Sequence, residues 1–373
     1  MRKNLISPVV LILVVVVAGY LVLVQNPYPP VTGPVSVVDA LGRTVQVELP
    51  VDRVIITGKS AFPITSVAYM FNSAPKVLYG LDQRTTNVPL FRAVDPSIDA
   101  KTVSADLGAG SDAPNVEELA KLDPDLVIFK TAVKLQVAES LESLGISVIY
   151  VDLENIDSYL RDIRLLGKIF GEESRASNLA SYYEEKYRYV LSKTATLTPS
   201  QRPRCLFLYY STKGGTISFN APGPNWLQTS MIETAGGYSL SKELVASGWN
   251  TVSFEQIAQW DPEIIFVVTY SEEPSPLEVK ENILNDLLWR NVTAIKEGKI
   301  YAVPDDSHLI AIGSWDAPNS RWILGQLWMA KKIQPTLFAD LDLTAEVKQF
   351  YMNMYGLNEK SAGEIIQQIT GDL

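Results

Sequence analysis

Few residues in the chain could support metal, thiol or nucleophile chemistry. Its 373 residues include one histidine, His308, and one cysteine, Cys205. A zinc site of histidine and cysteine needs three or four such ligands, and a disulfide needs two cysteines, so the chain alone can build neither. Gly313-Ser314-Trp315 lacks the second glycine of a nucleophile elbow, and Gly108-Ala109-Gly110 lacks the rest of a dinucleotide fingerprint. We therefore expect no catalytic residue, no metal ligands and no resident cofactor, which favours a binding protein over an enzyme.

Length and charge narrow the class further. Lys and Arg number 32 against 42 Asp and Glu, a formal net charge of −10, and no run of basic residues occurs. Binding to phosphate backbones needs a basic face, so nucleic acid is not an expected partner. A chain of this length can form two lobes, each with its own core.

The N-terminal segment predicts export and contact with a membrane. Arg2 and Lys3 precede an uncharged apolar run over residues 5–24, which is long enough to cross a bilayer as a helix. Positive residues stay on the cytoplasmic side, so the rest of the chain would be extracytoplasmic. We favour a transmembrane anchor because the run exceeds a usual signal core; a cleaved signal peptide is the alternative. Residues 1–25 are then the anchor or signal segment, and residues 26–36 are a proline-rich spacer.

The exported part has an α/β pattern. Short, continuous apolar runs such as 53–57, 125–129, 205–210 and 264–268 are typical of parallel strands buried on both faces. Residues 172–197 contain no Pro or Gly and predict one helix of about 26 residues, either a strut between lobes or an ordinary surface helix. We expect an N-terminal lobe over 37–155, linking helices over 156–200, and a C-terminal lobe with closing helices over 201–373. Each lobe would contain a parallel sheet.

One segment occurs twice, at residues 115–128 and 253–266. Both copies predict a short helix that a proline stops and turns into a buried strand. Asn115 and Ser253 are suitable N-caps, and Glu117 and Glu255 each stand seven residues before the proline. Because one copy lies on each side of the predicted long helix, the repeat indicates two lobes of similar architecture.

Together with Val38-Asp39-Ala40-Leu41-Gly42-Arg43, Leu165-Leu166-Gly167-Lys168 and Ala235-Gly236-Gly237, this repeat resembles a known family. The family is the substrate-binding proteins of ABC importers for ferric siderophores, haem and cobalamin. The resemblance implies two α/β lobes joined by a long helix, with an ABC permease and its ATPase as partners. It also implies that Glu117 and Glu255 dock with permease arginines, with Glu118 as the neighbour that could replace Glu117. The alternative is that both are first-turn acids stabilised by the helix dipole.

Ligands of open α/β sheets bind beyond the carboxyl ends of the strands, which selects loops of both lobes. Basic residues there could pair with an anionic ligand, aromatic residues could form flat walls, and polar residues could donate hydrogen bonds. Each also has a structural alternative, as a solvated charge or as part of the core. The candidate ligand-binding residues are Lys59, Ser60, Phe62, Arg84, Lys130, Asn220, Trp226, Trp249, Tyr270, Trp315 and Arg321.

The expected ligand is a metal chelate, meaning a ferric siderophore, haem or cobalamin, held between the lobes. A bare divalent metal is disfavoured because the similar proteins that take one use several histidines. His308 could be an axial ligand to a chelated metal, or simply a solvated loop residue. One alternative is an oxyanion such as molybdate or tungstate. A second alternative is a membrane-anchored sensor or scaffold that takes no part in transport.

Overall fold

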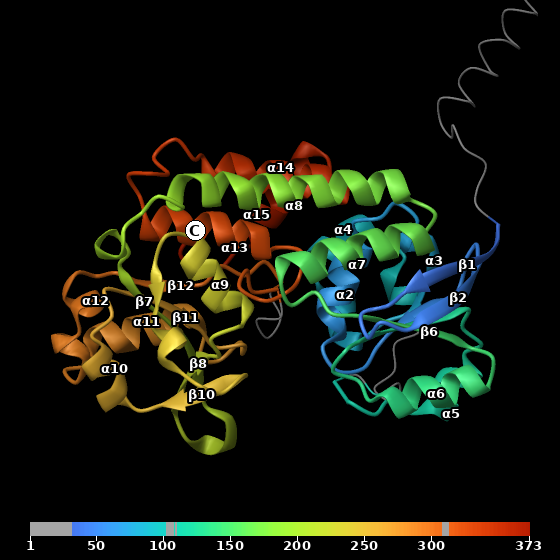
Figure 1. The fold of residues 1–373 in the computed structure, drawn as a ribbon, viewed down its shortest axis with the longest axis horizontal. Helices are drawn as coiled ribbons and strands as arrows, with labels where there is room; N and C mark the ends of the chain where they lie inside the picture. The colour runs from blue at the N-terminus through green and yellow to red at the C-terminus, as the bar shows by residue number, and fades with distance from the viewer. Residues whose placement is uncertain (1–31, 102–107, 109, 308–312) are drawn as a thin grey trace, which may run out of the picture.

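The computed structural model describes residues 32–101, 108, 110–307 and 313–373, without the side chains of residues 83 and 84. Two α/β lobes lie side by side, and a layer of helices that includes α8 and α14 runs along one edge of both (Figure 1). Within the described part of the chain, no helix is both long and apolar enough to cross a bilayer. The apolar run at 5–24 lies outside the described residues, so the anchor stays a prediction.

The first lobe is built on a parallel sheet with strand order β4-β3-β5-β6. The sequence Leu-Val-Ile-Phe-Lys of β5 is buried at all five positions, as expected of a strand covered on both faces. A separate antiparallel pair, β1 and β2, precedes this sheet. The strands are β1 (Gly33–Val38), β2 (Thr44–Leu49), β3 (Val54–Ile56), β4 (Leu78–Gly80), β5 (Leu126–Lys130) and β6 (Ser147–Val151). The helices are α2 (Ala61–Ala68), α3 (Ala74–Val77), α4 (Pro89–Val94), α5 (Val116–Lys121) and α6 (Leu135–Ser143).

The second lobe contains a mixed sheet, with order β10-β8-β7-β11-β12 and β9 beside β7. The prediction of a parallel sheet holds for the pairs among β7, β9, β11 and β12 but is wrong for β8, which runs antiparallel to both of its neighbours, β7 and β10. A short connection through Gly214 and Gly215 joins β7 to β8, and such a hairpin permits only antiparallel pairing. The strands are β7 (Arg204–Ser211), β8 (Ser218–Pro222), β9 (Tyr238–Ser239), β10 (Trp249–Val252), β11 (Ile264–Val268) and β12 (Ile300–Ala302). The helices are α9 (Leu227–Thr234), α10 (Phe254–Trp260), α11 (Pro276–Asn285) and α12 (Thr293–Lys296).

Further helices of the described ranges connect and cover the lobes. They are α7 (Ile156–Ile169), α8 (Glu173–Thr194), α13 (Trp322–Ile333), α14 (Leu343–Tyr355) and α15 (Glu359–Ile366). The predicted long helix is confirmed as α8, which has 22 residues and is about 33 Å long. It ends three residues before the predicted Leu197, because the Thr198-Pro199 turn follows.

Side-chain contacts bond α8 to both lobes. At its N-terminal end, Arg175 donates to the carbonyl of Met70 in the first lobe at 3.0 Å and to that of Met354 in α14 at 2.7 Å. At its C-terminal end, Thr194 Oγ1 donates to the carbonyl of Thr234 in α9 at 2.8 Å. The helix therefore acts as a bonded strut and not as a loose tether.

Candidate functional site

Four aromatic side chains of the second lobe form one cluster. Trp249 lies at its centre, with ring centroids 5.3 Å from Trp226, 5.1 Å from Tyr209 and 5.8 Å from Tyr270. The Tyr209 and Tyr270 centroids are 5.0 Å apart. Trp226, Trp249 and Tyr270 are each only partly buried, so the cluster offers ring surface to a ligand. We call these four residues the aromatic cluster.

The sheet positions two members of the cluster at the carboxyl ends of its parallel strands. Tyr209 lies near the end of β7, and Tyr270 is the second residue after β11. This is the edge at which α/β sheets bind ligands. Trp249 starts β10 opposite Pro222, the last residue of β8, and Trp226 is the N-cap residue of α9. The helix α9 lies on the side of the second lobe that faces the first (Figure 1).

A buried carboxylate below the cluster holds Tyr270. Asp316 is completely buried and accepts hydrogen bonds from the Tyr270 hydroxyl, from Gln228 Nε2 at 3.0 Å and from the Ser314 hydroxyl. Burial raises the pKa of Asp316, although these donors act in the opposite direction. Burial, and then the charge of Asp316, raise the pKa of Tyr270, so this phenol stays protonated and donates. The backbone of Tyr270 has a φ of 48°, a left-handed conformation that disfavours a bulky residue and that this bond helps to hold.

The first lobe presents a polar turn at the carboxyl end of β3. Lys59 and Ser60 are exposed there, and Ser60 is the N-cap residue of α2. The first turn of α2 contains no acidic residue, so its amide groups keep their positive potential. Gly58 makes the turn with a φ of 88°, and a Cβ at this position would lie 2.7 Å from Val133 Cγ2. The predicted pair Lys59 and Ser60 therefore shares one exposed turn.

Three other predicted ligand residues have partners within the fold. Phe62 is buried, with its ring 5.4 Å from that of Phe91. Lys130 is buried at the end of β5 and forms an ion pair with Glu154. Asn220 is buried in β8, where its amide nitrogen donates to Ser218 Oγ at 3.1 Å. Their alternative interpretation as structural residues fits these surroundings better than direct ligand contact.

Arg321 and Trp315 are completely buried in the core. Arg321 Nε pairs with Asp306 Oδ2 at 3.0 Å, and its guanidinium lies 5.8 Å from the Phe62 ring. Burial is the largest single influence on the pKa of Arg321 and lowers it. The charge of Asp306 and the other neighbouring groups together outweigh burial, so the pKa lies above its ordinary value. The side chain of Arg84 and all of His308 lie outside the described residues, so their predicted contacts stay predictions.

The repeated segment forms the expected helix, turn and strand in both lobes. Asn115 Oδ1 accepts the amide of Glu117 at 3.0 Å, and Ser253 Oγ accepts that of Gln256 at 3.1 Å. Glu117 and Glu255 are exposed, and neither forms an ion pair within the described part of the chain. Bonds with its own backbone amide, and then with Ser253, lower the pKa of Glu255. The helices α5 and α10 lie at the same edge of the molecule, opposite α8 and α14 (Figure 1).

The repeat also has a structural role that its sequence pattern does not reveal. The acid after the proline caps the neighbouring strand in both lobes: Asp125 accepts the amide of Arg53 at 2.8 Å, and Glu263 accepts that of Arg204 at 2.8 Å. Each acid also donates its own amide back, to the Arg53 carbonyl at 3.0 Å and the Arg204 carbonyl at 2.8 Å. This reciprocal pairing explains why an acid follows the proline in both copies.

No group of His, Cys, Asp or Glu side chains in the described ranges could hold a metal ion. The buried Cys205 has its pKa raised by burial, so it is a poor nucleophile. The described site therefore offers aromatic surface, a lysine and helix amides, which are groups for binding.

Sequence reasoning brought three members of the cluster together but missed Tyr209, Gln228 and the role of Asp316. The signal for Tyr209 is a tyrosine near the carboxyl end of a buried strand, where an aromatic side chain reaches the ligand edge of the sheet. Asp316 directly follows the candidate Trp315, yet its partner Gln228 is 88 residues away in sequence. No local pattern predicts such a pairing.

The chain is similar to binding proteins of transporters along most of its length. The sequence profile of the periplasmic binding protein family matches residues 67–307. A molybdate-binding protein of Haemophilus influenzae is 22% identical, over 66% of this chain and 71% of its own length. A cobalamin-binding protein of Halobacterium salinarum is 26% identical, over 62% of this chain and 61% of its own. A periplasmic solute-binding protein of Veillonella parvula, known from its crystal structure, matches with a TM-score of 0.73 and 28% identity over 89% of this chain and 97% of its own.

Fold, repeat and comparisons agree on the class: the chain belongs to the periplasmic binding protein family. Members of this family are solute-binding proteins of transporters. Accordingly, this chain is an extracytoplasmic substrate-binding protein of an ABC importer.

Proposed function

We propose that this substrate-binding protein captures a metal chelate with extended flat or apolar surface, such as a ferric siderophore, haem or cobalamin, and delivers it to an ABC permease. The observation that carries the proposal is the aromatic cluster. Tyr209 and Tyr270 lie at the ligand edge of the sheet, Trp249 and Trp226 extend the cluster from them, and three of the four residues are partly exposed. Aromatic faces of this kind bind planar or apolar ligands through dispersion and edge-to-face contacts.

The fixed position of Tyr270 supports this proposal. A ring bonded through its hydroxyl to Asp316 loses little freedom when a ligand packs on it, because it is already ordered. The relatives include proteins named for cobalamin, iron and haem uptake. We also propose that residues 5–24 anchor the protein to the outer face of the cell membrane, which would keep it near its permease.

A ligand panel tests the proposed substrate class. The purified chain would be titrated with ferric siderophores, haem, cobalamin, molybdate and tungstate while its unfolding temperature is followed. A ligand at 100 times its dissociation constant adds about 2.7 kcal/mol to stability, which is a clear upward shift. Trp249→Ala should then lower the affinity for the chelate that binds. Trp289→Ala, which removes a buried tryptophan outside the cluster, should lower stability without this selective loss of affinity. Binding by no chelate in the panel would refute the proposal.

One observation favours a second candidate, an oxyanion. The N-terminus of α2 has no first-turn acid and presents exposed Lys59 and Ser60, groups that suit a small anion. A molybdate-binding relative supports testing it. If molybdate stabilises the chain and Ser60→Asp abolishes this effect while Trp249→Ala does not, the oxyanion is the cargo and the chelate proposal fails.

We propose that Glu117 and Glu255 dock with basic residues of the permease. Both are exposed, form no ion pair with any described residue, and lie in the first turn of equivalent helices at one edge of the molecule. The double variant Glu117→Arg with Glu255→Arg should abolish uptake without changing ligand affinity. A matched control is Glu173→Arg with Glu281→Arg, which reverses an exposed first-turn acid on α8 and an exposed acid on α11.

The docking experiment also separates transport from the sensor or scaffold alternative. Uptake that the docking variant abolishes and the control variant leaves intact would support delivery to a permease through these acids. Unchanged uptake in the docking variant would show that docking does not use them. If the chain binds its ligand but cells that lack the chain take up this ligand normally, the result would support the sensor or scaffold alternative.

A further inference from the structure

A cavity lies in the second lobe, at the edge of the sheet opposite Tyr209 and Tyr270 of the aromatic cluster. It has a volume of about 730 Å³ and is lined by residues before or near the starts of β7, β11 and β12, by the end of α13 with Pro335, by the start of α14 and by Leu373. Ile264 begins β11, and Tyr270 follows the same strand six residues later. At about 3.3 Å per residue, the strand separates the two sites by roughly 20 Å.

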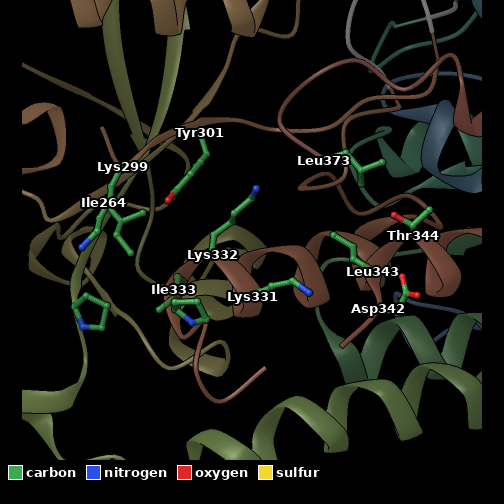
Figure 2. Close-up of a pocket in the computed structure, with 12 residues that line it drawn as sticks. Ile264, Lys299, Tyr301, Lys331, Lys332, Ile333, Asp342, Leu343, Thr344 and Leu373 are labelled. Carbon is green, nitrogen blue, oxygen red and sulfur yellow. The ribbon is translucent and has the colours of Figure 1, made fainter. Parts of the chain in front are cut away.

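The walls of this cavity are apolar and basic together. Ile264, Ile333 and Leu343 supply aliphatic surface, and Figure 2 shows Lys331 and Lys332 projecting from the end of α13 among them. Lys299, which precedes β12, adds a third lysine. Cavities of a few hundred cubic ångströms with apolar walls and a few polar groups are typical of small-molecule sites.

Two of the lysines already have partners. Lys299 Nζ pairs with Glu297 at 2.6 Å, and Lys331 Nζ donates to the carbonyl of Leu341. These bonds satisfy part of their donor capacity and hold both ammonium groups at the cavity wall.

Lys332 differs from them, because no carboxylate among the described residues forms an ion pair with it. Its ammonium lies 5.2 Å from the centroid of Tyr301 and 6.0 Å from that of Trp328, with which it makes cation–π contacts. It is half-buried, and burial lowers the pKa of Lys332, with nearby Asp372 opposing this effect. A half-buried ammonium that has ring contacts but no carboxylate in ion-pair contact would gain free energy from an anionic ligand.

The start of α14 brings groups of both signs to the cavity. Leu343 and Thr344, in its first turn, line the cavity together with the N-cap residue Asp342. Asp342 accepts the amide of Ala345 at 3.0 Å, so its negative charge, with that of Glu346 in the first turn, offsets the helix dipole there. Asp342 is exposed to solvent, which screens its charge, whereas Lys332 is half-buried.

We infer that this cavity is a second ligand site for a small organic anion, a carboxylate or phosphate ester with an apolar body, whose charged group pairs with Lys332. The anionic group would lie against Lys332, with Lys331 and Lys299 nearby, and the apolar body would fill the space beside Ile264 and Leu343. The site is separate from the aromatic cluster, so its occupancy does not depend on the cargo that is transported.

Three probes of one shape test the sign of the charge. The purified full chain would be titrated with 4-fluorobenzoate, 4-fluorobenzyl alcohol and 4-fluorobenzylammonium, and fluorine NMR line broadening would give each dissociation constant. The carboxylate should bind at least about tenfold more tightly than either of the others, as a charge-assisted bond requires. Equal binding of all three would overturn the inference. Displacement of 4-fluorobenzoate by an equal concentration of inorganic phosphate would also overturn it, because the apolar walls would then contribute nothing.

Two variants test the location. Lys332→Gln should lower the affinity for 4-fluorobenzoate about tenfold, whereas Lys360→Gln, on an exposed lysine of α15, should leave this affinity unchanged. Thr344→Glu places an acid in the first turn of α14, which the helix dipole favours, so it should block the probe without lowering the unfolding temperature. This second variant decides the test if Lys332→Gln fails to fold. Unchanged binding in Thr344→Glu would place the probe elsewhere and refute the site.

Discussion

The bond between Tyr270 and Asp316 predicts a measurable coupling free energy. Tyr270→Phe removes one of the three donors to a buried carboxylate, and hydrogen bonds to charged groups contribute about 1.5–3 kcal/mol. Asp316→Asn keeps the shape but turns one acceptor into a donor facing other donors, which should destabilise the chain by a similar amount. In the double variant the two losses overlap, because neither side chain retains its partner. We expect a coupling of about 1–2 kcal/mol.

Urea unfolding of the wild-type chain, the two single variants and the double variant would give this coupling. A matched surface pair provides the control, since the Tyr189 hydroxyl donates to Asp340 Oδ2 at 3.3 Å in an exposed setting. The cycle of Tyr189→Phe with Asp340→Asn should show a coupling near zero, because water replaces the lost partner. A coupling for Tyr270 and Asp316 no larger than that of the control would refute the view that Asp316 holds the aromatic wall in place.

Three further predictions concern pH, backbone strain and lobe movement. Burial and the neighbouring carboxylate of Asp306 raise the pKa of Asp305 to about 7, so folding favours its protonated form. That stabilisation, about 4 kcal/mol at most, is present at low pH and is lost as the pH rises through 7. In urea unfolding from pH 5 to 8, the free energy of unfolding should therefore depend less on pH in Asp305→Asn than in the wild-type chain. Gly58→Ala should destabilise the chain by about 2–3 kcal/mol, because the new Cβ adds a clash with Val133 to an unfavourable φ. Gly145→Ala, with a φ of 84° and open space around it, should lose about 1 kcal/mol in the same assay. Equal losses would show that the clash with Val133 contributes nothing. Because α8 is bonded to both lobes, ligand should leave the radius of gyration from small-angle X-ray scattering unchanged, and a clear decrease would contradict the strut.

Much of the architecture follows from patterns that are local in the sequence. Short continuous apolar runs such as β5 and β11 are typical of buried strands, and the absence of Pro and Gly from residues 173–194 allows the long helix. The repeat predicts both N-caps, because Asn115 and Ser253 need only groups within three residues. These features were predictable because their physical causes lie within a few positions of one another.

The site depends on contacts that are distant in the sequence. Asp316 meets Gln228 and Tyr270 only after the second lobe has folded, and Arg321 becomes a core residue because Asp306 and two rings of the first lobe surround it. The strand β8 was missed because its sequence Ser-Phe-Asn-Ala-Pro contains no continuous apolar run, and the short hairpin before it determines its antiparallel pairing with β7. Residue type therefore predicted the kinds of groups near the ligand, but burial and partners decided which of them remain available.

The contacts of α14 have a consequence for how the molecule is assembled during synthesis. The sheet of the first lobe is complete once residue 151 has been made, yet the Tyr355 hydroxyl donates to the carbonyl of Ser66 in that lobe, and Arg175 bonds with Met354. Tyr355 and Met354 are translated 289 and 179 residues after Ser66 and Arg175, by which time domains that emerge first have usually begun to fold. The contacts of α14 with the first lobe and with α8 can therefore form only after most of the chain has been synthesised. Until then, the first lobe lacks the bonds that fix it to the rest of the molecule.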